Sequence, residues 1–240
     1  MRLIMSCILA IETSSPILSI AFQQDGKPFV ESTLQGYSGH VENLIPLIDQ
    51  MLKNQSVSIS EVDTFLLGRG PGSFTGLRVG FATVKALQTV QKRNCYGAAS
   101  LDMIAEHITL KDGSVLAVGL DAHRSRIYSK FFVRQQNEWK PQSEIQLHSI
   151  EEFMKALPEN GWLAGDALLR YREILEPKQK LMHWNFLPEP DGYPRAASLL
   201  SLFQKKDSRI QKLQTPEDFL PLYLRLSEAE EKKNEHAPAS

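Results

Sequence analysis

The sequence predicts an α/β fold built from two similar halves. Short apolar runs typical of strands alternate along the 240 residues with longer segments whose apolar residues recur at helical spacing. The pattern restarts near the middle, because VLAV at residues 115–118 repeats the ILAI of residues 8–11. Each run leads to an acidic residue, Glu12 or Asp121, and then to another β-rich segment. The repeat indicates a duplicated β-β-β-α unit, although two buried strands could also share such residues by coincidence.

The first elements are three short strands and one helix. The strands are expected at residues 8–11, 18–22 and 27–33, and Asp25 and Gly26 form a hairpin turn signal between the last two. A helix is expected over residues 40–53, where apolar residues recur on one helical face. These apolar residues are Val41, Leu44, Ile45, Ile48, Met51 and Leu52. Pro46 should either kink this helix or lie in its opening turn.

The later elements continue the alternation. In the first half, strands are expected at residues 64–67 and 95–98 and helices at 75–92 and 100–108, the last with Ser100 as its N-cap. After the strand at 115–118, the second half is expected to contain strands at 126–133 and 162–164 and helices at 151–157, 167–175 and 196–203. This second half is shorter in regular structure, with Pro188, Pro190 and Pro194 in its connections.

The composition is that of an ordinary globular protein. Apolar residues make up 42% and charged residues 23%, so the core needs neither disulfides nor metal for stability. A net charge of −1 argues against a strongly basic nucleic-acid binder. The two cysteines, Cys7 and Cys95, form no paired motif, which fits a reducing cytoplasm. No apolar run approaches the ~18 residues of a membrane span, and residues 227–240 have almost no apolar content, as is typical of a disordered tail.

The segment GRGPGSFTGLRVG, residues 68–80, holds five of the chain's 14 glycines. Three of them, Gly72, Gly76 and Gly80, recur every four residues, so that they form one bare stripe on a helix. A glycine inside a helix costs about 1 kcal/mol relative to alanine. The stripe therefore needs a compensating reason, either close packing of another backbone or a ligand on the exposed amides.

The ligand interpretation finds little support in the motif. A Walker A loop requires Lys and Ser or Thr after its last glycine, whereas Leu77 and Arg78 follow Gly76. A dinucleotide pattern that begins at Gly70 has Thr75 in place of its third glycine. A helix start capped by Ser73 or Thr75 could still hold an anion. We favour close helix packing at a subunit or domain interface, where the Arg78 fork could pair with a partner carboxylate if it is not simply solvated.

This glycine segment resembles the signature of the TsaB (YeaZ) family, the dimerisation subunits of bacterial tRNA threonylcarbamoyladenosine synthesis. Further segments resemble that family in the expected order over most of the chain: ILAIETSS (8–15), HVENLIPLID (40–49), ASLDMIA (99–105), GLDAHRSRIY (119–128) and PLYLR (221–225). The resemblance implies a duplicated, actin-like (ASKHA) architecture with ribonuclease-H-like halves. We expect an N-terminal subdomain over 1–110, a reduced C-terminal subdomain over 111–226 and a disordered tail over 227–240.

Four residues could belong to a vestigial nucleotide region: Glu12, Asp121, Gly165 and Asp166. An actin-like ATPase places phosphate- and metal-directing acids after strands such as those that precede Glu12 and Asp121. Phosphate binding usually also needs glycine for close backbone approach, and neither turn supplies it. We therefore favour acids that cap turns or pair with neighbouring groups, with Asp166 as the cap of a helix.

Catalytic groups are sparse. The six histidines include no H-x-x-x-H pair, which would place two imidazoles on one helical face for a metal. The resemblance implies such a pair in the catalytic TsaD family, whereas the corresponding stretch here, SLDMI (100–104), has no histidine and His107 stands alone. Ser73 lacks the G-x-S-x-G elbow, and Cys95 lies in an apolar strand. Neither metal-dependent nor nucleophilic catalysis is expected.

The resemblance implies a cytoplasmic, non-catalytic subunit required for threonylcarbamoyl transfer to the adenosine beside the tRNA anticodon. The chain would heterodimerise with a TsaD-type catalytic subunit, be joined by a TsaE-type ATPase and reach tRNA indirectly through the complex. It would bind no cofactor alone, because ATP and metal would lie on the partner subunits. The expected partner interface is Gly72, Ser73, Phe74, Thr75, Gly76, Leu77, Arg78, Val79, Gly80, Thr83 and Val84.

Two other hypotheses remain open at this point. The first is a small actin-like ATPase or kinase with its own nucleotide site near Glu12 and Asp121. The second is a self-associating regulatory protein that pairs through the same glycine-striped helix. A homodimer through that helix is also compatible with the partner-subunit hypothesis.

Overall fold

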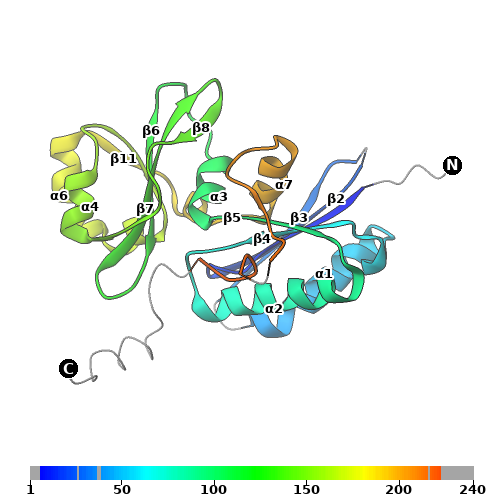
Figure 1. The fold of residues 1–240 in the computed structure, drawn as a ribbon. Coiled ribbons are helices and arrows are strands. Elements are labelled where there is room, and N and C mark those ends of the chain that lie inside the picture. The colour runs from blue at the N-terminus through cyan, green and yellow to red at the C-terminus, as the bar shows by residue number, and fades with distance from the viewer. Residues whose placement is uncertain (1–5, 26, 37–38, 216, 223–240) are drawn as a thin grey trace, which may run out of the picture.

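The computed structural model describes residues 6–25, 27–36, 39–215 and 217–222 of the chain. Two β-sheets lie side by side, with helix α3 (Ser100–His107) between them (Figure 1). Gly26 of the expected hairpin turn, the last three residues of the PLYLR segment and the expected disordered tail lie outside the described residues.

The first sheet has the strand order β12-β5-β4-β1-β2-β3. Its strands are β1 (Cys7–Glu12), β2 (Ile17–Gln24), β3 (Val30–Gln35), β4 (Thr64–Gly68), β5 (Asn94–Ala98) and β12 (Gln211–Lys212). The strands β1, β2 and β3 form an antiparallel meander, whereas β4 is parallel to β1 and β5 is parallel to β4. The central strand β1 is buried along its whole length, as its unbroken apolar run predicts for a strand covered on both faces.

The second sheet repeats this arrangement. Its strands are β6 (Val115–Asp121), β7 (Arg126–Gln135), β8 (Glu138–Pro141), β9 (Gln146–Ser149), β10 (Gly161–Ala164) and β11 (Trp184–Phe186). The order β11-β10-β6-β7-β8, with an antiparallel β6-β7-β8 meander and parallel β10 and β11, matches β5-β4-β1-β2-β3. The predicted duplication is thereby confirmed, and the molecule has the two ribonuclease-H-like halves of an actin-like architecture.

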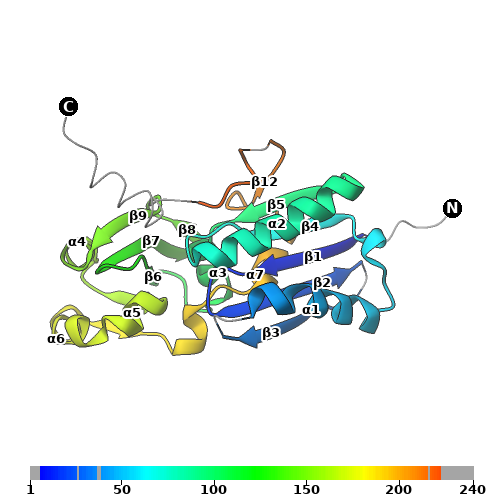
Figure 2. The same ribbon diagram turned by 90° about the horizontal axis from the view of Figure 1, so that it is seen from below.

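Helices cover both faces of the first sheet. Helices α1 (His40–Asn54) and α2 (Phe74–Gln91) lie together on one face (Figure 2), and α7 (Ala196–Gln204) packs on β1, β2 and β4. Alternate residues of β1 serve the two cores, because Leu9 and Ile11 face the core of α1 and α2 and Ile8 and Ala10 face that of α7. Pro46 lies inside α1.

The second sheet carries shorter helices. These are α4 (Ile150–Ala156), α5 (Asp166–Arg170) and α6 (Arg172–Met182). Two 3₁₀ turns complete the regular structure of the described residues: η1 (Ile59–Glu61) precedes β4 of the first sheet, and η2 (Glu189–Gly192) follows β11 of the second. The helix predicted over 167–175 is divided at Tyr171 into α5 and α6. The N-cap of α3 is Ala99 rather than the predicted Ser100, because the Ser100 hydroxyl lies 2.8 Å from that of Ser14 and pairs with it instead.

The expected extent of the second subdomain, 111–226, differs from the structure. Helix α7 returns to the first sheet, where the Ala196 N–H donates to Ser19 Oγ over 2.9 Å. Strand β12 then pairs with β5, and Leu213 and Phe219 enter the core beneath α1 and α2. The physical reason is burial, since the apolar side of α7 covers the face of the first sheet that α1 and α2 leave open.

The glycine stripe packs against the β1–β2 turn of the same chain. A Cβ added to Gly76 would lie 2.0 Å from the carbonyl oxygen of Thr13, and one added to Gly72 would lie 2.3 Å from that of Ser14. A Cβ on Gly80 would lie 2.5 Å from Thr13 Oγ1. The close backbone approach predicted from the stripe is therefore present, but the approaching backbone is the chain's own turn.

This contact predicts an unusual response to alanine in α2. Alanine normally stabilises a helix by about 1 kcal/mol relative to glycine, whereas Gly76→Ala should lower the free energy of unfolding by about 1–3 kcal/mol because its Cβ overlaps a backbone oxygen that cannot rotate away. Gly80→Ala should cost less, because its nearest neighbour is the Thr13 side chain. Urea unfolding of both variants measures the difference. A Gly76→Ala protein as stable as the wild type would contradict the close contact.

Candidate functional site

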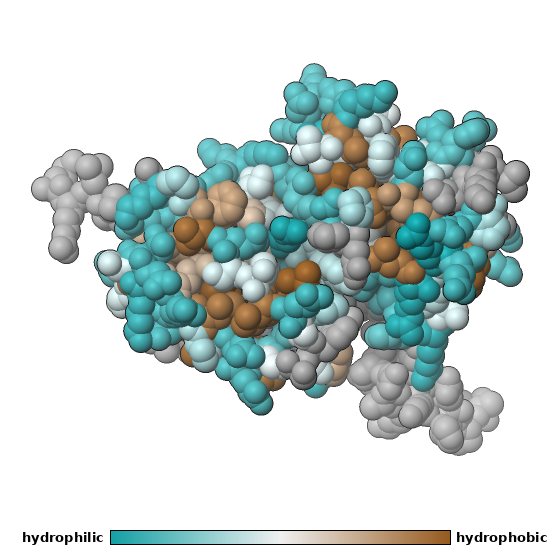
Figure 3. All heavy atoms as spheres, turned by 180° about the vertical axis from the view of Figure 1, so that it is seen from behind, coloured by the Kyte–Doolittle hydropathy of each residue, from teal (hydrophilic) through white to brown (hydrophobic). Residues whose placement is uncertain are grey.

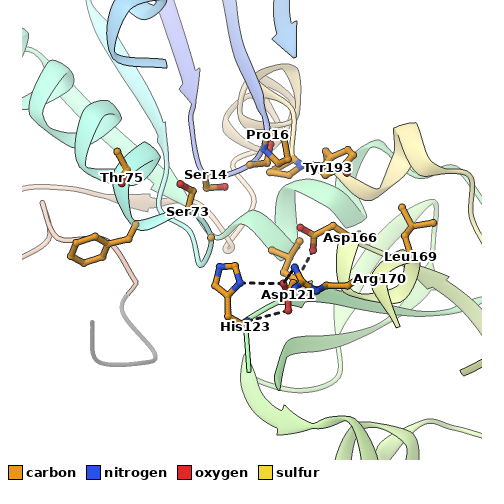
Figure 4. A pocket seen from close by; sticks show the side chains of 15 residues that line it. Ser14, Pro16, Ser73, Thr75, Asp121, His123, Asp166, Leu169, Arg170 and Tyr193 are labelled. Carbon is orange, nitrogen blue, oxygen red and sulfur yellow. Dashed lines mark hydrogen bonds and ion pairs between the residues drawn. The ribbon is translucent and has the colours of Figure 1, made fainter. Parts of the chain in front are cut away.

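A cavity of about 510 Å³ lies between the two halves (Figure 4). The first half contributes the β1–β2 turn and the start of α2: Ser14, Ser15, Pro16, Gly72, Ser73, Phe74 and Thr75. The second half contributes the end of β6 and helix α5: Leu120, Asp121, His123, Asp166, Leu169 and Arg170. Tyr193 and Pro194, on the connection that returns to α7, complete the wall.

Asp121 is fixed by three neighbouring side chains. Arg170 Nη1 lies 2.9 Å from its Oδ2, and the Tyr171 hydroxyl donates to its Oδ1 over 2.9 Å. The His123 backbone N–H donates to Oδ1 over 3.0 Å, and the His123 ring Nδ1 lies 3.4 Å from Oδ2. Both carboxylate oxygens therefore have protein partners, so that Asp121 acts as an anchor at the cavity wall.

The turn after Asp121 has an unusual backbone. His123, Arg124 and Ser125 have φ values of 59°, 50° and 56°, which are left-handed conformations that non-glycine residues rarely adopt. The Asp121 carboxylate holds the first of them, and the Ala122 N–H donates to the Arg126 carbonyl oxygen over 2.9 Å. Such strain persists only where the surroundings determine it strongly, and it is common at functional sites.

Gly165 and Asp166 bring α5 onto β6. A Cβ at Gly165, whose φ is 114°, would lie 1.9 Å from the Gly119 carbonyl oxygen, so only glycine permits this approach. The prediction that Asp166 caps its own helix is wrong, because Gly165 is the N-cap and Asp166 Oδ1 instead accepts the Asp121 N–H over 2.9 Å. Burial raises the pKa of the Asp166 carboxyl, and the hydrogen bond from Asp121 partly offsets that rise.

Glu12 is separated from these acids. It is fully buried outside the cavity lining, and its Oε1 accepts the Ser14 N–H. Its Oε2 has no hydrogen-bond partner in the described part of the chain and occupies the space beside Gly68 that a Cβ would need. Burial raises the pKa of Glu12 to about 7, against the opposing effect of the hydrogen bonds at Ser14.

Strand register explains why Glu12 is buried in the core whereas Asp121, at the corresponding place in the second half, lies on the cavity wall. The pairing of β1 with β4 reaches Ile11 and Leu67, directly beside Glu12. The pairing of β6 with β10 ends at Val118 and Ala164, three residues before Asp121. The end of β6 therefore extends into the cavity, whereas Glu12 remains under the glycine segment. Of the four residues expected near a nucleotide, the structure brings Asp121 and Asp166 to the cavity wall, with Gly165 next to them.

Other candidate groups are structural. Among the residues that the structure describes, no group of three or more His, Cys, Asp or Glu side chains could hold a metal ion. Both ring nitrogens of His107 lie 3.2 Å from carbonyl oxygens, those of Met103 and Asp191, and burial lowers the pKa of this imidazole. Burial also raises the pKa of the Cys95 thiol to about 12, so that it stays a protonated core group. None of the described helices has the length and apolar character of a membrane-spanning segment.

The expected partner interface divides into two sets. Gly76, Leu77, Gly80 and Val84 are buried within the chain itself, which corrects the expectation that Gly76 and Gly80 of the glycine stripe meet another subunit. Ser73 is the N-cap of α2, and its Oγ accepts the Gly76 N–H over 3.2 Å. The residues at least partly open to solvent are Gly72, Ser73, Phe74, Thr75, Arg78, Val79 and Thr83. The Arg78 guanidinium lies 3.8 Å from the centroid of the Phe74 ring.

Two exposed residues of α1 extend this surface and were not predicted as site residues. Val41 is 64% exposed and Ile45 is 54% exposed, and α1 lies beside α2 on the same face of the sheet (Figure 2). We call the set Val41, Ile45, Phe74, Arg78, Val79 and Thr83 the outer helical face. The sequence signal was the apolar stripe on α1, because it includes Val41 and Ile45 in addition to Leu44, Ile48, Met51 and Leu52, which are the members that pack in the core. On the face of the molecule seen from behind, apolar residues form groups between hydrophilic ones (Figure 3).

The buried carboxyl of Glu12 predicts a specific pH dependence. Its folded pKa lies above its ordinary value of 4.5, so wild-type stability is lost as pH rises from about 4.5 towards 7 and the folded protein ionises this group. Glu12→Gln does not titrate, so its stability relative to the wild type should increase over this range by up to roughly 3 kcal/mol. Urea unfolding at several pH values measures this difference. A stability difference that is independent of pH would contradict the raised pKa.

Comparisons with known proteins agree with these features. The family model of TsaD, described as tRNA N6-adenosine threonylcarbamoyltransferase, matches residues 37–189. Proteins named tRNA threonylcarbamoyladenosine biosynthesis protein TsaB from Haemophilus influenzae and Bacillus subtilis are 25% and 24% identical; the matches cover 91% and 94% of this chain and 93% and 96% of those proteins. The solved structure of YeaZ from Pseudomonas aeruginosa is 25% identical with a TM-score of 0.73, over 92% of this chain and 100% of that one. Because the family model covers more than half of the sequence and TsaB relatives and a YeaZ structure align along nearly all of it, the chain belongs to the TsaB (YeaZ) family of TsaD-related proteins.

Proposed function

We propose that this chain is a non-catalytic partner subunit in tRNA threonylcarbamoyladenosine biosynthesis that acts by forming a heterodimer with a TsaD-type catalytic subunit. The role in this pathway rests on the relatives named for it, which align along nearly the whole chain. The pairing rests on one observation, the exposed apolar side chains of the outer helical face.

The outer helical face has the chemistry of a docking surface. Val41 and Ile45 expose apolar area that gains about 25 cal/mol per Å² when it is removed from water. Phe74 lies beneath the guanidinium of Arg78, and aromatic and arginine side chains are enriched at the centres of protein interfaces. This stacked pair is already ordered in the isolated chain, which lowers the entropy cost of binding.

The close packing beneath this face supports a rigid role. The turn at Thr13 and Ser14 locks α2 from below, and the Ser73 N–H donates to the Ser14 carbonyl oxygen over 2.7 Å. A rigid face can hold a partner in one conformation, because a subunit that binds the active form of its partner more tightly shifts the population towards that form. In this proposal the chain stabilises the tRNA-competent state of the catalytic subunit.

The hydrogen bonds and burial of Asp121 and Glu12, the acids at the ends of β6 and β1, support the proposal that this chain is not catalytic. Asp121 has its oxygens engaged by Arg170, Tyr171 and His123, and Glu12 is enclosed in the core. The proposal therefore assigns ATP and metal chemistry to the TsaD-type subunit and a TsaE-type ATPase, and tRNA contact to the assembled complex. A homodimer of this chain would use the outer helical face as well and would compete with the heterodimer.

A pair of matched substitutions tests the docking surface. Ile45→Lys should weaken binding to the cognate TsaD-type protein by at least tenfold, about 1.4 kcal/mol, because an ammonium replaces exposed apolar area that the proposed interface would bury. Ile174→Lys is the control, since Ile174 is 50% exposed on α6 in the other half of the molecule. Co-elution and titration calorimetry with each variant give the affinities. Equal heterodimer affinity for Ile45→Lys and the wild type would refute the assignment of the face.

Transfer assays test the role itself. Threonylcarbamoyl transfer to tRNA should require this chain and the TsaD-type protein together with the TsaE-type ATPase, and Ile45→Lys should lower it in proportion to the lost complex. Activity should return when the variant is added in excess, because only its affinity is reduced. Transfer by this chain without the TsaD-type subunit would overturn the non-catalytic assignment.

The cavity between the halves gives the rival hypothesis, an actin-like ATPase or kinase, its specific support, because two acids line it. We expect the isolated chain to hydrolyse ATP no faster than its Asp121→Asn variant, since Asp121 is engaged as an anchor. Phosphate release at millimolar ATP and Mg²⁺ measures this. Turnover by the wild type that disappears in a folded Asp121→Asn protein would favour the enzyme hypothesis.

A further inference from the structure

The segment that contains α2 carries positive charge only. Residues 64–101 include no Asp or Glu, although acids and bases are nearly balanced over the whole chain, whose net charge is −1. The segment does contain five cationic side chains: Arg69, Arg78, Lys85, Lys92 and Arg93. Two of them, Arg78 and Lys85, lie within α2 itself. The helix that supplies half of the outer helical face therefore presents cations and no acid.

Arg78 and Lys85 lie on one side of α2 together with Phe74. Residues 74, 78 and 85 fall within about 40° of one another around the axis of an α-helix, because they are four and seven positions apart. All three side chains are exposed. Seven residues span about 10 Å along a helix. Lys85 thus extends the exposed side of α2 by a second positive charge, about two helical turns beyond Arg78.

These two cations have no acidic partner in the folded chain. On α1, Lys53 Nζ lies 2.6 Å from Asp49 Oδ2 one helical turn away, and α6 contains an ion pair with the same spacing. By contrast, no ion pair within 4.0 Å includes Arg78 or Lys85 among the residues that the structure describes. The positive charge of α2 is therefore left for solvent or for a binding partner.

The Arg78 guanidinium is already oriented. Its central carbon lies over the Phe74 ring, 3.8 Å from the ring centroid. A guanidinium stacked on an aromatic ring keeps its N–H donors at the edge of the stack, where a carboxylate can accept two of them side by side. The Phe74 ring thus holds Arg78 in a position that suits a planar acceptor on a second molecule.

The surroundings favour a protein partner over a nucleic acid. Val41 and Ile45 expose apolar area on α1, beside α2. Protein interfaces combine an apolar centre with complementary charges near the rim, whereas nucleic-acid interfaces are more polar and rely on many phosphate contacts. Two cations next to exposed apolar side chains match the first description.

We propose that the TsaD-type partner meets this side of α2 with carboxylates, one opposite Arg78 and one opposite Lys85, about two helical turns apart. The inference rests on the proposed function and adds the chemistry by which the partner is recognised. Arg78 provides a bidentate contact and Lys85 a point charge. Complementary charges of this kind speed association and disfavour partners that carry cations at the same place.

Zero-length cross-linking of the full-length heterodimer tests the contact directly. A carbodiimide joins an amine to a carboxylate beside it, with loss of water, so the Lys85 amine should be linked to an Asp or Glu of the TsaD-type protein. In the Arg78→Lys variant, the introduced amine should give a second link, to another acid of the same protein. Lys155 is the control, because it is exposed on α4 in the other half of the molecule and should form no link to the partner.

Affinity measurements give an independent test. The dissociation constant of the wild-type heterodimer should rise with ionic strength, because salt screens exposed charges. Arg78→Glu should weaken the heterodimer at least tenfold at low ionic strength, whereas Lys155→Glu should leave its affinity unchanged. If Arg78→Glu does not fold, Lys85→Glu replaces it, because Lys85 lies outside the stack on Phe74.

The outcomes distinguish this inference from the proposed function. A wild-type heterodimer whose affinity is insensitive both to salt and to Arg78→Glu would overturn the inference and leave the pairing intact. No heterodimer of the wild type at any ionic strength would overturn both. Links from Lys85 only to a second copy of this chain, or an effect of Arg78→Glu that appears only when tRNA is present, would also overturn it, because the carboxylates would then not belong to the TsaD-type partner.

Discussion

The contact between the β1–β2 turn and the glycine side of α2 determines much of the molecule. The carbonyl oxygens of Thr13 and Ser14 occupy the space where the Cβ atoms of Gly76 and Gly72 would otherwise be. This approach fixes the first turn of α2, encloses Glu12 beneath the turn and forms one wall of the cavity between the halves. The outward side of α2 is consequently held in place from below, as the proposed docking surface requires.

The two halves share one topology, but the acid that ends the central strand is enclosed in the first half and reaches the cavity in the second. In the first half a helix of 18 residues follows the central parallel strand, and the acid at the end of β1 is sealed in the core. In the second half the corresponding helix has five residues, and Gly165 brings its start against Gly119. Asp121 can therefore reach the cavity and is bound there by Arg170 and Tyr171. A duplicated fold has thus produced one closed and one open strand end.

Local sequence was sufficient for the long elements and for the duplication, because strands buried on both faces and amphipathic helices have strong periodic patterns. It was insufficient for elements whose formation or position depends on residues far away in the sequence. The strands β8, β9, β11 and β12 are only two to four residues long and exist through pairing with remote partners. The return of α7 to the first sheet has no local signal either, since its apolar stripe would fit the surface of either sheet.

The candidate site likewise combines features that the sequence predicted with features that depend on contacts between distant residues. The glycine spacing predicted a close backbone approach, but it could not distinguish the chain's own turn from another subunit, because both would remove the Cβ atoms for the same reason. The positions of Asp121 and Asp166 after strands indicated the cavity, whereas the depth of Glu12 depends on strand register. Val41 and Ile45 were identified as apolar helix residues, and only their exposure in the folded chain marks them as surface residues.

The return of the last segment to the first sheet has a consequence for synthesis on the ribosome. The second half is inserted in sequence between two parts of the first, because α7, β12 and Phe219, which complete the first half, follow the strands of the second sheet in the chain. During translation, the face of the N-terminal strands that α7 covers in the folded protein stays exposed until about 200 residues have emerged. At about 5–20 residues per second this wait lasts many seconds. Nascent chains of this topology should therefore be clients of ribosome-associated chaperones, and their folding should be governed by long-range closure of the sheet rather than by their well-formed helices.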